Sequence, residues 1–305
     1  MKVMKIKRFL IAGVVGGCSL FSLLSPLFSA FKDPEFLARP AGMGGAFVAV
    51  SDDINAVWFN PAGISDVARQ SLLFTYSKPY LNLDGVNAGM SYASYLHPFG
   101  SNGTAAVSWA NFNTADLYQE NTVLLSYGYD LNFMQAGVNL TYLGRSVTTD
   151  ARTADDPVFV NGTTKSAYSV DAGVLKRFDG GFSLGASAKN LTQPDVGYAA
   201  NDAVPAEYRL GAAQVFSTET CDIIAALDAG YRNKEYNVYA GGEAWFLRHT
   251  LAGRLGGNRN EASIGASYLF RISDTNTLVT HYSFSWPFSI EGSSGSHRLS
   301  LGIEF

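Results

Sequence analysis

The chain has 305 residues, of which 47% are hydrophobic, 13% aromatic and only 16% charged. Because soluble domains usually carry about 25% charged residues, this composition disfavours an ordinary soluble protein. With 26 acidic and 22 basic residues the net charge is −4, which gives no support for a nucleic-acid partner.

The first thirty residues have the pattern of a secretory signal peptide. Four basic residues near the start precede an almost uncharged apolar run from Phe9 to Leu27, and Ser29 and Ala30 end the pattern with small side chains. This order predicts cleavage after Ala30, whereas a retained membrane helix is the disfavoured alternative. Removal of the four basic residues lowers the net charge to −8. We therefore expect an exported, acidic mature chain.

Residues 39–64 read RPAGMGGAFVAVSDDINAVWFNPAGI and form the most distinctive stretch of the chain. Three glycines open it, a residue type that permits unusual backbone conformations and the close approach of another backbone: Gly42, Gly44 and Gly45. Four residues with the composition of a turn close it: Asn60, Pro61, Ala62 and Gly63. So many turns indicate either a glycine-rich linker or a plug that lies against the walls of something larger.

Two adjacent carboxylates, Asp52 and Asp53, stand between the glycines and the closing turn. They could cap a short helical turn from Ala56 to Phe59 or pair with arginines of a surrounding wall. As a metal site they are a weak signal, because no further oxygen ligands are close in the sequence. We therefore predict no metal site.

The order G-M-G-G-A-F-V-A-V-x-D-D followed by N-P-A-G closely resembles the N-terminal segment of the FadL-like outer-membrane proteins. That superfamily includes the long-chain fatty-acid transporters and the PorV/PorQ group. The resemblance implies an all-β fold, a 14-stranded antiparallel transmembrane β-barrel with an N-terminal hatch inside the lumen. It also assigns the hatch and its gating to the three glycines, the two aspartates and the closing turn named above.

From Gln70 onward the chain divides into segments of about ten residues in which apolar and polar side chains alternate. Between Phe182 and Lys189, for example, every second residue is apolar. Bacterial single-chain barrels have an even number of strands, and a soluble β-sandwich is the disfavoured alternative. The fourteen predicted strands are 70–78, 85–97, 103–112, 119–130, 133–147, 166–178, 181–191, 206–217, 221–232, 236–246, 249–256, 260–271, 276–287 and 296–305.

The connections between these strands alternate in length. Tight turns at 130–132 and 179–181 follow even-numbered strands, and the longest connections, 148–165 and 192–205, follow odd-numbered ones. Outer-membrane barrels have short periplasmic turns and longer outer loops. The long connections are therefore predicted to face outward.

The last nine residues alternate cleanly and end on phenylalanine. They resemble the C-terminal strand signal through which the barrel-assembly machinery recognises outer-membrane barrels. The residues predicted to carry this signal are Leu299, Leu301, Ile303 and Phe305.

Enzymatic chemistry finds little support in the sequence. The four histidines lack the spacing of a zinc site, and no nucleophile elbow surrounds a serine. We expect no enzymatic activity and no cofactor. Charged residues of both signs are expected to face the lumen, where they could hold the hatch or simply solvate the interior: Asp171, Lys189, Arg209, Asp228, Glu243, Arg254 and Arg271.

The resemblance implies passive transport of hydrophobic small molecules, such as long-chain fatty acids, gated by the hatch. In the fatty-acid transporters the ligand is first collected between the third and fourth outer loops. The corresponding loops here contain a candidate apolar groove: Val158, Phe159, Val160, Val196, Tyr198 and Val204. The expected partners are outer-membrane lipid and a hydrophobic small-molecule ligand.

The alternative is a role in protein secretion or assembly, as in the PorV group, with secreted proteins as partners. The glycine pattern resembles that group at least as well as it resembles the fatty-acid transporters. Either role predicts a location in the outer membrane of a diderm bacterium. Both also predict the same three parts, a signal peptide (1–30), a hatch (31–69) and a barrel (70–305).

Overall fold

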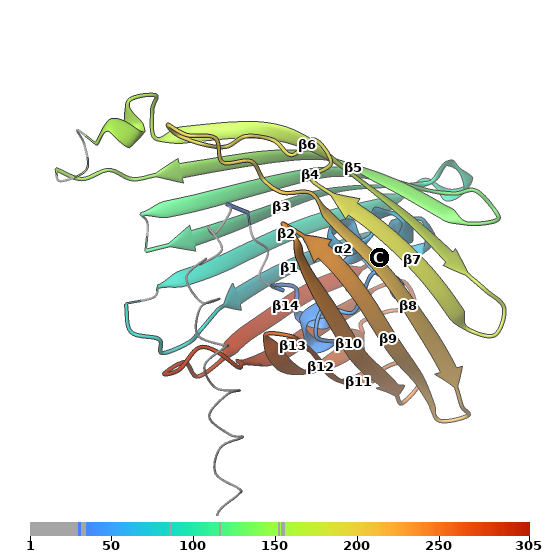
Figure 1. Ribbon diagram of the computed structural model, residues 1–305. Helices are drawn as coiled ribbons and strands as arrows, with labels where there is room; N and C mark the ends of the chain where they lie inside the picture. The colour runs from blue at the N-terminus through green and yellow to red at the C-terminus, as the bar shows by residue number, and fades with distance from the viewer. Residues whose placement is uncertain (1–29, 32–34, 86, 116, 152, 154–155) are drawn as a thin grey trace, which may run out of the picture.

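The computed structural model describes residues 30–31, 35–85, 87–115, 117–151, 153 and 156–305. Except for Ala30, the predicted signal peptide lies outside these residues. Fourteen antiparallel strands follow one another around a closed barrel (Figure 1). They are β1 (Ser71–Lys78), β2 (Ala88–Pro98), β3 (Thr104–Thr114), β4 (Tyr118–Asp130), β5 (Gln135–Val147), β6 (Thr164–Arg177), β7 (Phe182–Lys189), β8 (Glu207–Ser217), β9 (Cys221–Arg232), β10 (Glu235–Phe246), β11 (Leu251–Asn258), β12 (Glu261–Arg271), β13 (Thr277–Pro287) and β14 (Ser296–Glu304).

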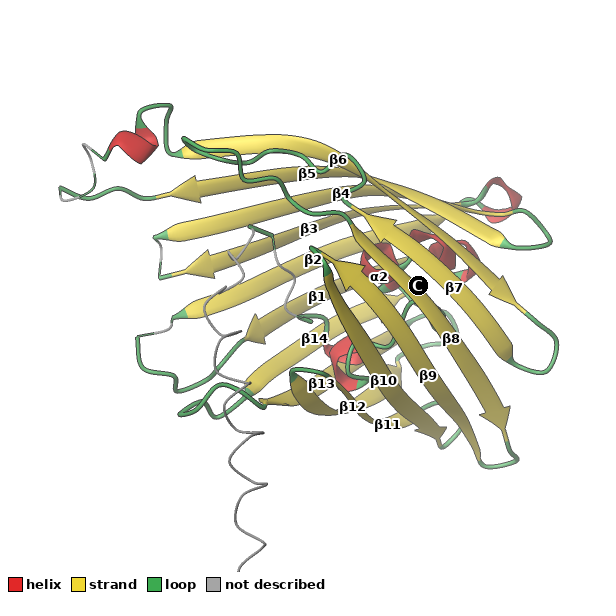
Figure 2. Ribbon diagram, in the orientation of Figure 1, coloured by secondary structure: helices red, strands yellow, loops and turns green. Residues whose placement is uncertain are grey.

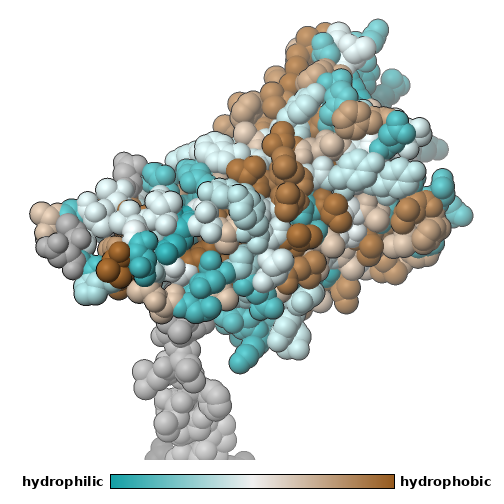
Figure 3. Space-filling view, turned by 90° about the horizontal axis from the view of Figure 1, so that it is seen from above, coloured by the Kyte–Doolittle hydropathy of each residue, from teal (hydrophilic) through white to brown (hydrophobic). Residues whose placement is uncertain are grey.

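The predicted number of strands and the antiparallel barrel are confirmed. The alternation in the sequence has its expected cause, because successive side chains of a strand point to opposite faces. On β12, Ser263 and Ser267 are buried inside, whereas Ile264 and Tyr268 are 60% and 50% exposed on the outside. On the face drawn in Figure 3, apolar residues lie among polar ones. Outward-facing apolar side chains are typical of membrane barrels.

The first and last strands close the barrel. β1 pairs with β14 along its whole length, from Ser71 opposite Glu304 to Lys78 opposite His297. β14 also pairs with β13 on its other side, so both of its edges are hydrogen-bonded. A closed ladder satisfies the backbone groups that an open sheet edge would leave unpaired in lipid.

The connections differ at the two ends of the barrel. Those after even-numbered strands are short, and the two longest, between β5 and β6 and between β7 and β8, lie at the opposite end. Short 3-10 turns lie in one connection at each end, Gly100–Asn102 and Pro157–Phe159. We refer below to the short-turn end and the long-loop end.

Three short helical elements precede the barrel: α1 (Ala38–Gly42), α2 (Ala56–Phe59) and the 3-10 helix η1 (Pro61–Asp66). All residues of α1 and α2 are buried, and both helices, red in Figure 2, lie within the ring of yellow strands. Among the residues that the structure describes, none of the helices has the length and apolar character needed to span a membrane.

Candidate functional site

The N-terminal segment, defined here as residues 35–69, lies against the inner face of the barrel wall. Its apolar side chains share one buried cluster with side chains of the wall. Phe36 packs on Trp58 and on Tyr92 of β2, with ring centroids 4.8 and 5.6 Å apart. The segment and the wall therefore have a common core, and the role of the segment as a hatch stays a prediction.

The glycines of the segment stand where its backbone meets the backbone of the wall. A Cβ atom on Gly44 would lie 2.1 Å from the backbone nitrogen of Gly257 in β11, and Gly44 has a φ of +65°. A side chain is excluded there by space and by conformation. At Gly42 a Cβ atom would lie 3.3 Å from the Cα of Gly265 in β12. Gly45 also has a positive φ, of +89°.

The wall carries matching glycines, whose function the sequence did not reveal. We call five of them the glycine belt, because a Cβ atom on each would lie within 2.5 Å of an atom of the N-terminal segment: Gly137, Gly173, Gly185, Gly241 and Gly256. Gly137 lies opposite Gly173 in the ladder, and Gly241 lies opposite Gly256. The alternation in the sequence placed these glycines on the inner face of the wall. It did not show which backbone they contact.

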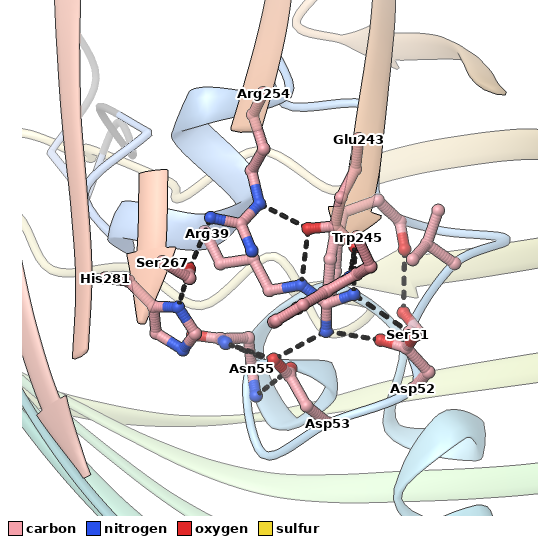
Figure 4. Close-up of polar contacts among 12 residues, drawn as sticks. Arg39, Ser51, Asp52, Asp53, Asn55, Glu243, Trp245, Arg254, Ser267 and His281 are labelled. Carbon is pink, nitrogen blue, oxygen red and sulfur yellow. Dashed lines mark hydrogen bonds and ion pairs between the residues drawn. The ribbon is translucent and has the colours of Figure 1, made fainter. Parts of the chain in front are cut away.

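Arg39 of α1 joins the segment to the wall through a buried ionic network (Figure 4). Its guanidinium is 2.6 Å from Asp52 and 2.8 Å from Asp53, and it reaches Glu243 of β10 at 2.7 Å. Glu243 also pairs with Arg254 of β11. Arg39 is only 4% exposed and Glu243 only 1%.

The wall side of this network continues onto β12 and β13. Arg254 donates to the hydroxyl of Ser267 on β12, which contacts His281 on β13. Trp245 donates its indole N–H to Glu243 at 2.6 Å. The network therefore ties α1 to four neighbouring strands.

Mutual pairing makes the burial of these charges tolerable, since an unpaired charge in such a place is costly. Burial lowers the pKa of Arg39, but the carboxylates of Asp52, Glu243 and Asp53 outweigh it and raise that pKa well above its usual value. Burial raises the pKa of Asp53, but Arg39 outweighs it and holds that pKa below its usual range. Asp52 and Asp53 were expected to cap a helix or pair with arginines of the wall. Their arginine comes instead from the segment itself.

A second set of bonds holds residues 47–49, in the middle of the segment. The carboxylate of Asp228 on β9 accepts the backbone N–H of Phe47 at 2.8 Å and that of Val48 at 2.9 Å. Ser183 of β7 donates to the carbonyl of Ala49 at 2.8 Å. Of the seven charged residues expected in the lumen, five are buried, whereas Lys189 is half-buried and Arg271 is exposed.

The turn at Asn60 locks the end of the segment. The Asn60 side chain accepts the N–H of Ala62 and donates to the carbonyls of Val48 and of Val174 in β6. Pro61 occupies the first turn of η1, where its missing N–H costs no hydrogen bond. A Cβ atom on Gly63 would lie 2.0 Å from the carbonyl oxygen of Ser51.

The two connections expected to form an apolar groove meet through Phe159 and Tyr198, whose ring centroids are 5.5 Å apart. Val158 and Val160 are 45% and 77% exposed. Val196 and Val204 are 0% exposed and pack in a buried cluster with Phe31 and Leu143. Tyr198 is also buried, at 9% exposure, so three of the six groove residues are covered by the chain itself, and the groove stays a prediction.

The residues of the predicted assembly signal lie in or directly after β14. Leu299 and Leu301 point outward and are 46% and 48% exposed, and they lie opposite Tyr76 and Phe74 of β1. Ile303 is half-buried. Phe305 is 43% exposed, and its backbone N–H donates to the carbonyl of Gln70 at 2.9 Å.

A cavity of ≈370 Å³ opens beside the ionic network at the short-turn end. Asp52, Asp53 and Glu304 line it together with Trp245 and apolar residues of β13 and β14. The side chain of Asp52 is 37% exposed there. The lining contains both carboxylates and apolar groups, so the cavity is not a purely hydrophobic pocket.

A sequence model of the protein family described as type IX secretion system membrane protein PorP/SprF matches residues 53–303. A comparison with curated proteins finds no match. Among solved structures, the chain is similar to a Pseudomonas aeruginosa FadL homologue, with a TM-score of 0.56, 12% identity and coverage of 90% of this chain and 98% of that chain.

Two toluene transporters have similar structures. Ralstonia pickettii TbuX has a TM-score of 0.56 at 10% identity, with coverage of 88% of this chain and 97% of that chain. Pseudomonas putida TodX has a TM-score of 0.56 at 11% identity, with coverage of 91% and 99%. At these identities the likeness shows the fold alone.

Proposed function

The chain belongs to the PorP/SprF family of type IX secretion system membrane proteins, and from this membership we propose that it serves protein secretion as an outer-membrane barrel closed by its N-terminal segment. In this proposal the barrel is a platform that other secretion proteins contact, and its lumen is not the path of export. The proposal assigns no catalytic step to the chain. The family match supports it because the match spans the whole barrel and the end of the segment.

The contacts that hold the N-terminal segment against the wall are the observation that supports a closed lumen. If α1 left the wall, Arg39 would lose Glu243, and the carboxylate and guanidinium would each lose a buried partner. Among charged partners, Glu243 would keep only Arg254. Arg39 would keep only Asp52 and Asp53. The bonds to Asp228 and the contacts with the glycine belt would be lost as well. These costs favour a segment that stays in place during function.

A second candidate is the passive, hatch-gated channel for hydrophobic small molecules expected from the sequence. The fold that the chain shares with the toluene transporters supports it. Two observations weigh against a hydrophobic path for such a ligand. Val196 and Val204 are buried, and the cavity is lined in part by charged side chains.

Deletion of the gene in its native host separates the two candidates. Proteins released into the medium are quantified by mass spectrometry, and uptake of a labelled long-chain fatty acid is measured in the same cells. We expect the deletion to abolish the release of a set of exported proteins and to leave uptake unchanged, and the wild-type gene should restore the release to the parental pattern. Normal release together with lost uptake would contradict the platform and favour the channel.

A further inference from the structure

Phe31 fills a closed pocket between the barrel wall and the connection that follows β7. Its side chain is only 7% exposed. It packs in one buried cluster with Leu143 of β5, with Val196 and Val204, and with Ala30, which is 8% exposed. Because Leu143 and the two valines come from two distant parts of the chain, the walls of the pocket are supplied by the folded barrel and the connection after β7.

Charged side chains hold the backbone of Phe31 at both of its ends. The nitrogen of Phe31 donates to Oε1 of Glu120 on β4 at 2.9 Å, and the same oxygen accepts the hydroxyl of Tyr118 at 2.6 Å. The carbonyl oxygen of Phe31 accepts from Nη2 of Arg232 on β9 at 2.8 Å. A carboxylate binds a charged ammonium more strongly than a neutral amide. The site is therefore better matched to a free amino terminus than to an internal peptide.

The backbone of Phe31 is strained in the uncut chain. Its φ is +56°, a value that residues with a Cβ atom rarely adopt. This torsion is defined by the peptide bond to Ala30, the residue after which the sequence predicts cleavage of the leader. Once that bond is cut, the torsion no longer constrains the chain, so cleavage relieves the strain.

We propose that the amino terminus of the mature chain is a ligand of the barrel itself. Hydrolysis of the Ala30–Phe31 peptide bond by a signal peptidase consumes one water and leaves a carboxylate on Ala30 and an ammonium on Phe31. The ammonium pairs with Glu120, while the ring occupies the pocket of Leu143, Val196 and Val204. The mature chain is then anchored at its first residue, Phe31, and again in the N-terminal segment by the Arg39 network. This inference does not depend on the proposed function.

The test uses mature protein purified from outer membranes in mild detergent. Intact mass and N-terminal sequencing identify the first residue, which we expect to be Phe31. The folded protein is then treated with an amine-acylating reagent near neutral pH, where an α-amino group with a pKa of about 8 reacts ahead of lysines with a pKa of about 10.4. Labelling of the α-amine is followed by mass spectrometry of the N-terminal peptide.

Glu120→Gln should speed this labelling about tenfold or more. The hydrogen bond between the charged amine and Glu120 favours the bound, unreactive amine over the released one by about this factor. Leu143→Ala should also speed it by opening the apolar side of the pocket without changing any charge. The matched control is Glu291→Gln, which neutralises an exposed glutamate in the connection before β14, at the same end of the barrel, and should leave the rate unchanged. Heat-modifiable migration on gels identifies the folded fraction of each variant.

Two results would overturn the proposal. The first is a mature chain that begins at a residue other than Phe31. The second is an α-amine that is labelled equally fast in folded wild type and in the folded Glu120→Gln or Leu143→Ala variant.

Discussion

Arg39 is the cation that joins the segment to the wall in the buried charge network. It carries one positive charge against Asp52 and Asp53 of its own segment and against Glu243 of the wall. Without it, three carboxylates would share Arg254 as the remaining buried cation of the network drawn in Figure 4. A truncation at this position should therefore be far more costly than a change at a surface arginine.

Arg39→Ala is expected to destabilise the folded protein by about 3–5 kcal/mol, the usual cost of removing one partner of a buried ion pair. The measurement is the midpoint of thermal unfolding, followed by heat-modifiable migration in detergent. Arg248→Ala, in the exposed turn after β10, is the matched control and should change the midpoint little.

The same network predicts non-additivity. The double variant Arg39→Met with Glu243→Leu should lose less stability than the sum of the two single variants, because each single variant loses the attraction between Arg39 and Glu243 and the double variant loses it only once. Additive losses in this cycle would mean that Arg39 and Glu243 do not interact energetically, whatever their distance.

The glycine belt allows a test on one strand. Gly256→Ala should destabilise the protein by about 1–3 kcal/mol through overpacking, since its Cβ atom would lie 2.2 Å from the backbone of Met43. Gly253→Ala on the same strand faces outward, where nothing lies within 4 Å of the new atom. Thermal midpoints and protease cleavage within the N-terminal segment are compared for the two variants. Equal behaviour of both would show that the belt does not hold the segment.

At the level of secondary-structure elements, the strands could be predicted because each carries its own period-two signal. All fourteen predicted ranges overlap the observed strands, and the start of β2 differs by three residues, at Ala88 instead of 85. The same alternation placed Glu243 and Arg254 inward, where they are buried. Local pattern was sufficient for these features.

The contacts of the N-terminal segment could not be predicted in the same way. Arg39 and Glu243 are separated by 204 residues. The sequence around either residue does not indicate that the other is its partner. The pocket of Phe31 likewise joins β4, β9 and the connection after β7. Such long-range pairs follow from the register and closure of the barrel, which a single sequence does not specify.

The C-terminal strand has an element-level role that can be tested. Phe305→Ala, or truncation before Leu299, should lower the amount of protein in the outer membrane, because β14 forms the closing ladder with β1, pairs with β13 on its other side and carries the predicted assembly signal. The measurement is immunoblotting of membrane fractions. Phe270→Ala, an exposed aromatic at the end of β12, is the control for loss of a surface ring. Normal insertion of the truncated chain would contradict both roles.

At the level of the whole molecule, the barrel and its N-terminal segment form one buried core, but the barrel ladder does not depend on the segment. Each strand is hydrogen-bonded to two neighbouring strands around the closed sheet. Deletion of residues 36–60 removes Arg39, α1 and α2 and leaves every strand intact. The deleted chain should therefore still insert as a barrel, with a lumen lined by the charged and polar side chains that the segment now covers.

That deletion should convert a closed barrel into an ion-conducting one, measured as single-channel conductance in a planar bilayer, because a barrel of this many strands encloses an aqueous space when nothing fills it. Deletion of residues 156–161, in the exposed connection before β6, is the matched control and should leave conductance at the full-length level. Fatty-acid uptake by cells that carry the 36–60 deletion then separates the two candidate functions. A hatch-gated channel should change its fatty-acid uptake when the hatch is removed. A platform should leak ions and leave fatty-acid uptake unchanged. A deletion that conducts no more than the full-length protein would mean that the segment does not close the lumen, and both candidates would lose the feature they share.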